Sequence, residues 1–166
     1  MTRQEITEFY RQHHRRLYNT AWRILRDSDD AEEVMQDTLL KYITRSEADR
    51  PALEPQIQAW LCKACVRASI DRLRERQRRD LFLKAYAQEE EEETLPEEEV
   101  PASALNVAQI QKALDRLPEP YRLVVDMVLL EGLDYEEMAE ITGKKEGTLR
   151  SLYSRGRAKL KNILTQ

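Results

Sequence analysis

Two cysteines and two histidines are the side chains of this sequence that could support catalysis or metal binding. Cys62 and Cys65 form a C-x-x-C pair, a spacing that can bind zinc or cycle between dithiol and disulfide. The pair lies within a helical pattern and has no second pair, which favours small buried cysteines. His13 and His14 are adjacent and would point in different directions on a helix. Since there is also no glycine-rich phosphate loop, we predict no catalytic residue, no metal site and no cofactor.

Nucleic-acid recognition is indicated instead by the basic stretch at residues 133–161. Asp134 can cap a short helix, with Glu137 completing a capping box, and Gly143 can end that helix in the left-handed conformation. A longer helix should begin near Glu146, with basic residues and serines outside its apolar face. This arrangement is typical of a helix-turn-helix that reads the DNA major groove; an ordinary helical bundle is the alternative. The expected apolar face consists of Leu149, Tyr153, Gly156 and Leu160.

A second basic helix is expected from Ile57 to about Arg79, with Trp60 and Leu61 on its inner face. From Lys63 onward it carries seven basic and two acidic side chains. Arginines at this density suit contacts with phosphates, each of which releases condensed counterions. A solvated helix end is the alternative interpretation.

Two helices should precede it, at residues 5–25 and 31–44. The second has a charged outer face, which is usually only solvated but can be a partner site. The first helix is expected to bury Ile6, Phe9, Tyr10, Leu17, Tyr18, Ala21, Trp22 and Leu25. The outer face of the second consists of Asp30, Glu33, Gln36, Asp37 and Lys41.

The net charge of −4 is distributed unevenly along the 166 residues. Residues 1–88 hold 17 basic and 14 acidic side chains, whereas residues 89–100 hold eight acidic and no basic ones. Such a stretch repels itself and cannot bury apolar surface, so we predict a linker at residues 89–101. The sequence therefore predicts an all-α protein of two small helical domains, residues 1–88 and residues 102–166.

The second domain should contain two helices before the helix-turn-helix, at residues 104–116 and 121–130, separated by a proline-containing break. Val107 is expected on the inner face of the first of them. The most apolar stretch of the chain, residues 124–130, is short and contains Asp126, and the amino terminus lacks an apolar core segment. We therefore expect a reduced, cytoplasmic protein without stable membrane insertion.

Three segments together resemble a bacterial RNA polymerase sigma factor of the extracytoplasmic-function (ECF) group of the sigma-70 family. Residues 29–43 resemble the region 2 helix that docks on the clamp helices of RNA polymerase. Residues 58–79 resemble the helix that melts the promoter and recognises its −10 element. Residues 117–161 resemble region 4, which binds the −35 element.

The resemblance implies an initiation factor that performs no bond chemistry and works with core RNA polymerase, promoter DNA and an anti-sigma factor. The implied polymerase-binding residues are Asp30, Glu33, Gln36, Asp37 and Leu40. The implied −10 residues are Arg67, Arg74, Arg78 and Arg79. The implied −35 residues are Lys144, Lys145, Thr148, Arg150, Ser151, Ser154, Arg155 and Arg157.

The sequence also departs from the family pattern. The family usually has asparagine where Arg67 stands, often arginine where Leu152 stands, and a small polar cap where Lys145 stands. The loop at residues 45–56 has no aromatic residue, so capture of a flipped base would rest on hydrogen bonds and loop shape. Two other functions stay open: a stand-alone helix-turn-helix regulator, which would bind duplex DNA without polymerase, and a non-catalytic interaction protein.

Overall fold

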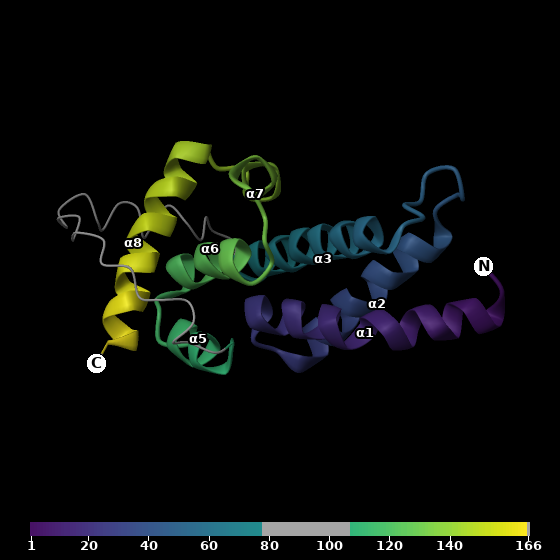
Figure 1. Ribbon diagram of the computed structural model, residues 1–166, viewed down its shortest axis with the longest axis horizontal. Coiled ribbons are helices and arrows are strands. Elements are labelled where there is room, and N and C mark those ends of the chain that lie inside the picture. The colour runs from purple at the N-terminus through teal and green to yellow at the C-terminus, as the bar shows by residue number, and fades with distance from the viewer. Residues whose placement is uncertain (78–106, 166) are drawn as a thin grey trace. The chain divides into compact units, whose positions relative to one another are not determined.

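The computed structural model describes residues 1–77 and 107–165, which form seven α-helices and no β-strand (Figure 1). The predicted all-α class is thereby confirmed. The helices are α1 (Arg3–Leu25), α2 (Ser28–Thr44), α3 (Glu54–Gln77), α5 (Val107–Leu114), α6 (Glu119–Leu129), α7 (Tyr135–Thr142) and α8 (Glu146–Leu164).

Some expectations fall outside the described residues. They are the linker at residues 89–101, the end of the second basic helix with Arg78 and Arg79, and the start of the helix expected at residue 104. The chain divides into two compact units, Met1–Arg78 and Arg79–Gln166. Each unit is therefore described by itself.

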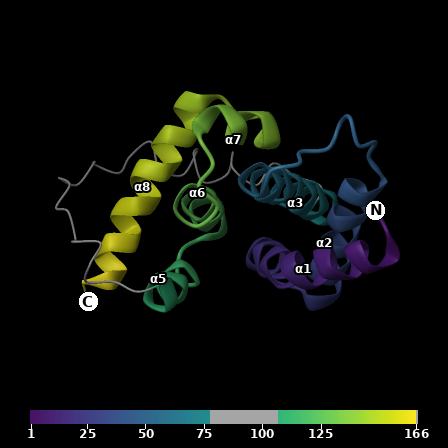
Figure 2. The ribbon, with the colours of Figure 1, turned by 45° about the vertical axis from the view of Figure 1, so that its right-hand side comes forward.

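The amino-terminal unit is a bundle in which α1, α2 and α3 all pack against one another (Figure 2). Thr2 and Glu5 form a capping box at the start of α1. Asp27 begins α2 by accepting a hydrogen bond from the amide of Asp30. The fully buried centre of the bundle includes Ala21, Ile24, Leu25, Ala31, Leu39, Leu61, Cys65, Val66, Ile70 and Leu73.

The predicted inner face of α1 is partly wrong. Tyr10 and Trp22 are 39% and 38% exposed, whereas His13 and Thr20 are buried. The two aromatic rings lie at the edge of the bundle, where Tyr10 stacks on His14 at 4.9 Å and Trp22 lies under the guanidinium of Arg26 at 4.8 Å. Apolar periodicity places a residue near the core, but an amphipathic aromatic ring can stop at its margin.

Prolines displace two predicted helix boundaries. Helix α3 begins at Glu54, before Pro55, so the preceding loop is three residues shorter than expected. Helix α6 begins at Glu119, with Pro120 in its first turn. Both starts are compatible with proline, because the first turn of a helix does not use its backbone N–H groups.

The carboxyl-terminal unit is built around α6, whose residues 121–127 are all buried. Helix α8 packs on α6, α7 and α5. Ala113, Leu114 and Leu117 are buried as the pattern predicts, but Val107 is 60% exposed, so its predicted inward position is wrong. It is the first described residue of α5, and the helix buries only its last turn.

Gly156 of α8 packs tightly on α6, and we expect Gly156→Ala to destabilise this unit. A Cβ atom there would lie 2.7 Å from Cγ2 of Val125, which is fully buried, and 3.3 Å from Cβ of Tyr121. Overpacking costs about 1–3 kcal/mol, whereas alanine in a helix gains about 1 kcal/mol over glycine, so a net loss of up to about 2 kcal/mol should appear in urea denaturation.

Gly147→Ala is the matched control, because Gly147 also lies in α8 and a Cβ atom there meets nothing within 4 Å. This variant should gain stability through helix propensity alone. If both alanine variants gain stability, α6 and α8 do not pack at Gly156 as tightly as the structure shows.

Candidate nucleic-acid and partner interfaces

The helix-turn-helix forms through the local signals that the sequence contains. The Asp134 carboxylate accepts a hydrogen bond from the amide of Glu137 at 2.8 Å, and the Asp134 amide donates to the Glu137 carboxylate at 3.2 Å. Gly143 ends α7 with a φ of 73°, and α8 begins at Glu146. The predicted capping box, the glycine cap and the start of the second helix are confirmed.

Helix α8 presents two different faces. Its inner face consists of Leu149, Leu152, Gly156 and Leu160, all of which are buried. Tyr153, predicted on that face, is only half-buried and meets the ring of Tyr135 edge-on at 6.4 Å. Of the predicted −35 residues, the exposed ones are Lys145, Arg150, Ser154 and Arg157, and the half-buried ones are Lys144, Thr148, Ser151 and Arg155.

Leu152 is fully buried, although the family often has arginine at this position. A charged side chain there would have to leave the core to reach DNA. The residue therefore contributes apolar packing to the carboxyl-terminal unit.

Lys145 occupies the N-cap of α8 without a side-chain hydrogen bond to the free amides. A serine hydroxyl could accept one of those amide hydrogens, so Lys145→Ser should stabilise the protein by about 0.5–2 kcal/mol in thermal unfolding. Lys144→Ser is the control, since Lys144 lies outside the cap and its amide already donates to the Thr142 hydroxyl. An equal gain from both variants would show that the cap is not the cause.

Two arginines of α3 are engaged within the bundle. Arg72 pairs with Asp30 at 3.2 Å and with Glu33 at 2.8 Å, and the hydrogen bond that its guanidinium donates to Glu33 is the main cause that raises the pKa of Arg72. Arg76 pairs with Asp30 at 2.8 Å and donates to the Leu25 carbonyl oxygen at 2.9 Å. Arg72 and Arg76 therefore tie α3 to the rest of the bundle rather than extending into solvent.

The same ion pairs change the expected outer face of α2. Asp30 is half-buried and Glu33, although exposed, reaches Arg72. The predicted outward position is wrong for Asp30, whose carboxylate lies between Arg72 and Arg76. Gln36, Asp37 and Leu40 are exposed as expected, and Leu40 is an apolar side chain with 56% of its surface accessible.

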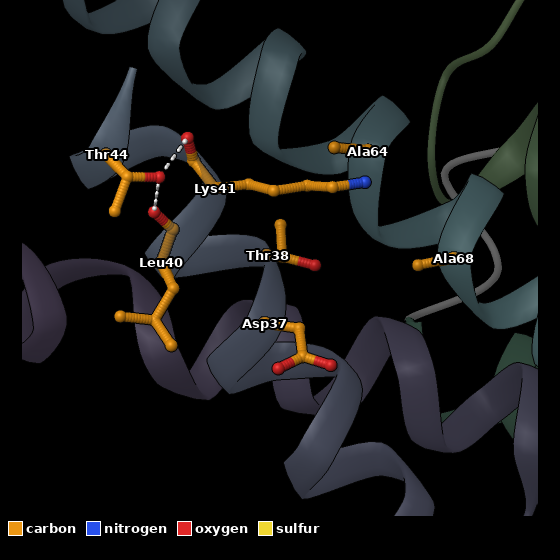
Figure 3. Close-up of a pocket in the computed structure, with 7 residues that line it drawn as sticks. All are labelled: Asp37, Thr38, Leu40, Lys41, Thr44, Ala64 and Ala68. Atoms are coloured by element: carbon orange, nitrogen blue, oxygen red, sulfur yellow. Dashed lines mark hydrogen bonds between the residues drawn. The ribbon is translucent and has the colours of Figure 1, made fainter. Parts of the chain in front are cut away.

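A shallow hollow of about 380 Å³ lies beside these residues, between α2 and α3 (Figure 3). Lys41 extends across it toward Ala64 and Ala68 of α3, while Leu40 points away from α3. The Thr44 hydroxyl donates to the Leu40 carbonyl oxygen at 2.8 Å. The hollow with its small apolar floor and charged rim could receive side chains of a partner helix. Its lining consists of Asp37, Thr38, Leu40, Lys41, Thr44, Ala64 and Ala68.

The loop between α2 and α3 is held against aromatic rings that belong to the helices. The guanidinium of Arg45 lies 5.4 Å from the ring centre of Trp60, and that of Arg50 lies 5.8 Å from the ring centre of Tyr42. The Tyr42 hydroxyl donates to the Pro51 carbonyl oxygen at 2.7 Å. The loop itself contains no aromatic residue, so the sequence alone did not reveal these contacts.

The described residues contain no group of three or more histidine, cysteine, aspartate or glutamate side chains that could hold a metal ion. Cys62 and Cys65 are buried and form no disulfide, and the Cys65 thiol donates to the Leu17 carbonyl oxygen at 3.4 Å. Their predicted burial is confirmed.

Burial lowers the pKa of His13, although the Glu54 carboxylate, 3.5 Å from its Nε2 atom, acts in the opposite direction. Within the described residues no helix is both long and apolar enough to cross a bilayer.

Comparison with known proteins agrees with this arrangement. Residues 9–79 match the family model "Sigma-70 region 2", and residues 108–160 match "Sigma-70, region 4". ECF RNA polymerase sigma factor SigE of Mycolicibacterium smegmatis is 32% identical over 161 residues, covering 96% of this chain and 61% of that protein. ECF RNA polymerase sigma factor SigM of Mycobacterium tuberculosis is 30% identical over 162 residues, covering 98% of this chain and 78% of that protein.

Among solved structures, the sigma factor RpoE from Bartonella quintana, in a complex with the anti-sigma factor NepR, matches with a TM-score of 0.57. The two chains are 23% identical, and the match covers 97% of each, which supports the fold.

Regions 2 and 4 in this order, with a helix-turn-helix in the second, define a sigma factor of the sigma-70 type. The chain belongs to the extracytoplasmic-function group of that family. Sigma factors are transcription initiation factors rather than enzymes, in agreement with the prediction made from the sequence.

Proposed function

We propose that this protein directs core RNA polymerase to promoters with a −10 and a −35 element, and that it acts in the cytoplasm. The observation that carries the proposal is the helix-turn-helix of the carboxyl-terminal unit, in which α8 buries an apolar face and exposes Arg150, Ser154 and Arg157. An arginine can pair with both acceptors of a guanine edge in the major groove, whereas a serine can bond to several bases.

The −35 surface in this proposal is the outer face of α8 together with the turn before it. Arg150 and Ser151 read base edges, and the other basic residues grip phosphates. The remaining members are Lys144, Lys145, Thr148, Ser154, Arg155 and Arg157.

The −10 surface is the carboxyl-terminal half of α3, where Arg67 and Arg74 contact the separated strand and its phosphates. Arg78 and Arg79, outside the described residues, extend this surface in the proposal. The loop arginines Arg45 and Arg50 lie on the rings of Trp60 and Tyr42, outside this half of α3.

The polymerase surface is the exposed part of α2, formed by Gln36, Asp37 and Leu40 beside the hollow. Asp30 and Glu33 support it by fixing α2 to α3. We also infer an anti-sigma partner, because the RpoE structure was solved with such a protein.

The domain boundaries are part of the proposal: residues 1–88 hold region 2, residues 89–101 form a linker, and residues 102–166 hold region 4. An acidic segment with few apolar residues cannot merge the hydrophobic cores of the two domains into one. Cleavage between residues 87 and 100 should therefore leave two fragments that are both helical when measured by circular dichroism. Loss of helicity in both fragments would place the boundary elsewhere.

The test of the function is binding to core RNA polymerase. The full-length protein, labelled with a fluorophore, should form a complex with core polymerase and acquire tight promoter binding only in that complex. A stand-alone regulator would instead bind its duplex site equally well without polymerase. An interaction protein would show neither kind of binding.

A further inference from the structure

Arg150 is held from two sides on the outer face of α8. Its guanidinium carbon lies 5.1 Å from the ring centre of Tyr135, which belongs to α7. One of its nitrogens lies 3.8 Å from a carboxylate oxygen of Glu146, one turn earlier on α8. The Arg150 side chain nevertheless remains 61% exposed, so DNA could still reach it.

The Tyr135 ring is a fixed platform. It follows Asp134, the N-cap residue of α7, is half-buried, and meets the ring of Tyr153 edge-on. Burial raises the pKa of the Tyr135 hydroxyl above its ordinary value. A planar guanidinium stacks well on such a ring, and the contact limits the directions in which Arg150 can point.

Glu146 places a negative charge at the start of the helix that faces DNA. The carboxylate is exposed, so a nearby phosphate would repel it, and Arg150 would have to give up its ion pair to bind that phosphate. A guanine edge returns two hydrogen bonds to the guanidinium in a fixed geometry. Glu146 therefore disfavours contacts of Arg150 with arbitrary DNA more than contacts with the correct base.

We propose that Tyr135 and Glu146 are positioning residues that set the sequence discrimination of Arg150. The ring fixes where the guanidinium points, and the carboxylate keeps it from phosphates until a guanine replaces the ion pair. The inference rests on the proposed −35 recognition and adds two residues outside the predicted set.

The first experiment compares Tyr135→Leu with Tyr135→Phe in holoenzyme assembled from core polymerase and the full-length chain. Two promoters are compared that differ only at the guanine for which Arg150→Ala removes the preference. The readout is the ratio of the holoenzyme's affinities for these two promoters. Leucine should lower this ratio about 2- to 5-fold, and phenylalanine should preserve it, because only the ring face is needed. Full discrimination by Tyr135→Leu, or an equal loss in both variants, would overturn the role of the ring.

The second experiment compares Glu146→Gln with Glu136→Gln, which removes one charge from the exposed first turn of α7. Glu146→Gln should raise the affinity for a random duplex more than the affinity for the promoter, whereas Glu136→Gln should raise both alike. If the ratio of promoter affinity to random-duplex affinity is the same in the two variants, the role of Glu146 is overturned. If the wild-type holoenzyme itself shows no preference, the proposed −35 recognition fails, and the inference fails with it.

Discussion

Arginine substitutions at Gln36 and Asp37 together should abolish stable binding to core RNA polymerase. Both residues are exposed on α2, Asp37 lines the hollow between α2 and α3, and neither residue contributes to the buried core. The double variant places two cations where the surface now offers a carboxylate and an amide. Like charges brought together at an interface cost several kcal/mol, so the dissociation constant should rise by about a hundredfold or more. Fluorescence titration of labelled protein with core polymerase measures the change.

Gln4→Arg with Glu8→Arg is the matched control for this experiment. These two residues are exposed on α1, four positions apart where Gln36 and Asp37 are adjacent, and their replacement changes the net charge by the same amount. The ion pair of Glu8 with Arg11 is highly exposed, so its loss should cost little stability. Equal loss of binding in both double variants would show a general charge effect and remove the assignment of α2 as the polymerase surface.

Arg150→Ala should abolish discrimination at one guanine of the −35 element. The guanidinium is exposed on the outer face of α8 and is already oriented by Tyr135 and Glu146. Losing a bidentate contact with guanine should cost about 1–3 kcal/mol on the correct promoter and much less on a promoter with another base there. Competition binding of holoenzyme to the two promoters gives the difference directly.

Arg157→Ala provides the comparison, because Arg157 is exposed on α8 nearer its carboxyl end. It should weaken binding to all sequences alike and reduce the salt dependence by about one charge. Lys159 is less suitable, since its ammonium lies 5.5 Å from the ring centre of Tyr121 and its removal would alter packing. Identical effects of the two arginine variants on specific and random duplexes would mean that Arg150 does not read a base.

Local signals made the helix-turn-helix predictable. Asp134, Glu137 and Gly143 each act within a few residues of their own position, so their roles can be inferred from spacing. The buried leucines of α8 follow from helical periodicity in the same way, apart from Leu152, where the family pattern indicated a polar position instead. The expected apolar face did not include Leu152, and the structure adds it to the buried residues of α8.

Contacts between distant segments were not predictable from the same patterns. The carboxylate of Asp30 looks solvent-facing on a helical wheel, yet its partners Arg72 and Arg76 are 42 and 46 residues away in the sequence. The platform under Arg150 likewise depends on how α7 meets α8, which places Tyr135 beside a residue 15 positions later. Helix packing, rather than sequence spacing, creates both arrangements.

Transcript mapping in vitro tests the central proposal most directly. Core RNA polymerase is incubated with genomic DNA fragments, with and without the full-length protein, and the 5′ ends of the transcripts are sequenced. We predict new start sites, present only with the protein, that share one motif near −10 and a second near −35 at a constant spacing. The Gln36 and Asp37 double variant should not produce them. The same start sites with and without the protein would contradict the assignment as a promoter-directing sigma factor.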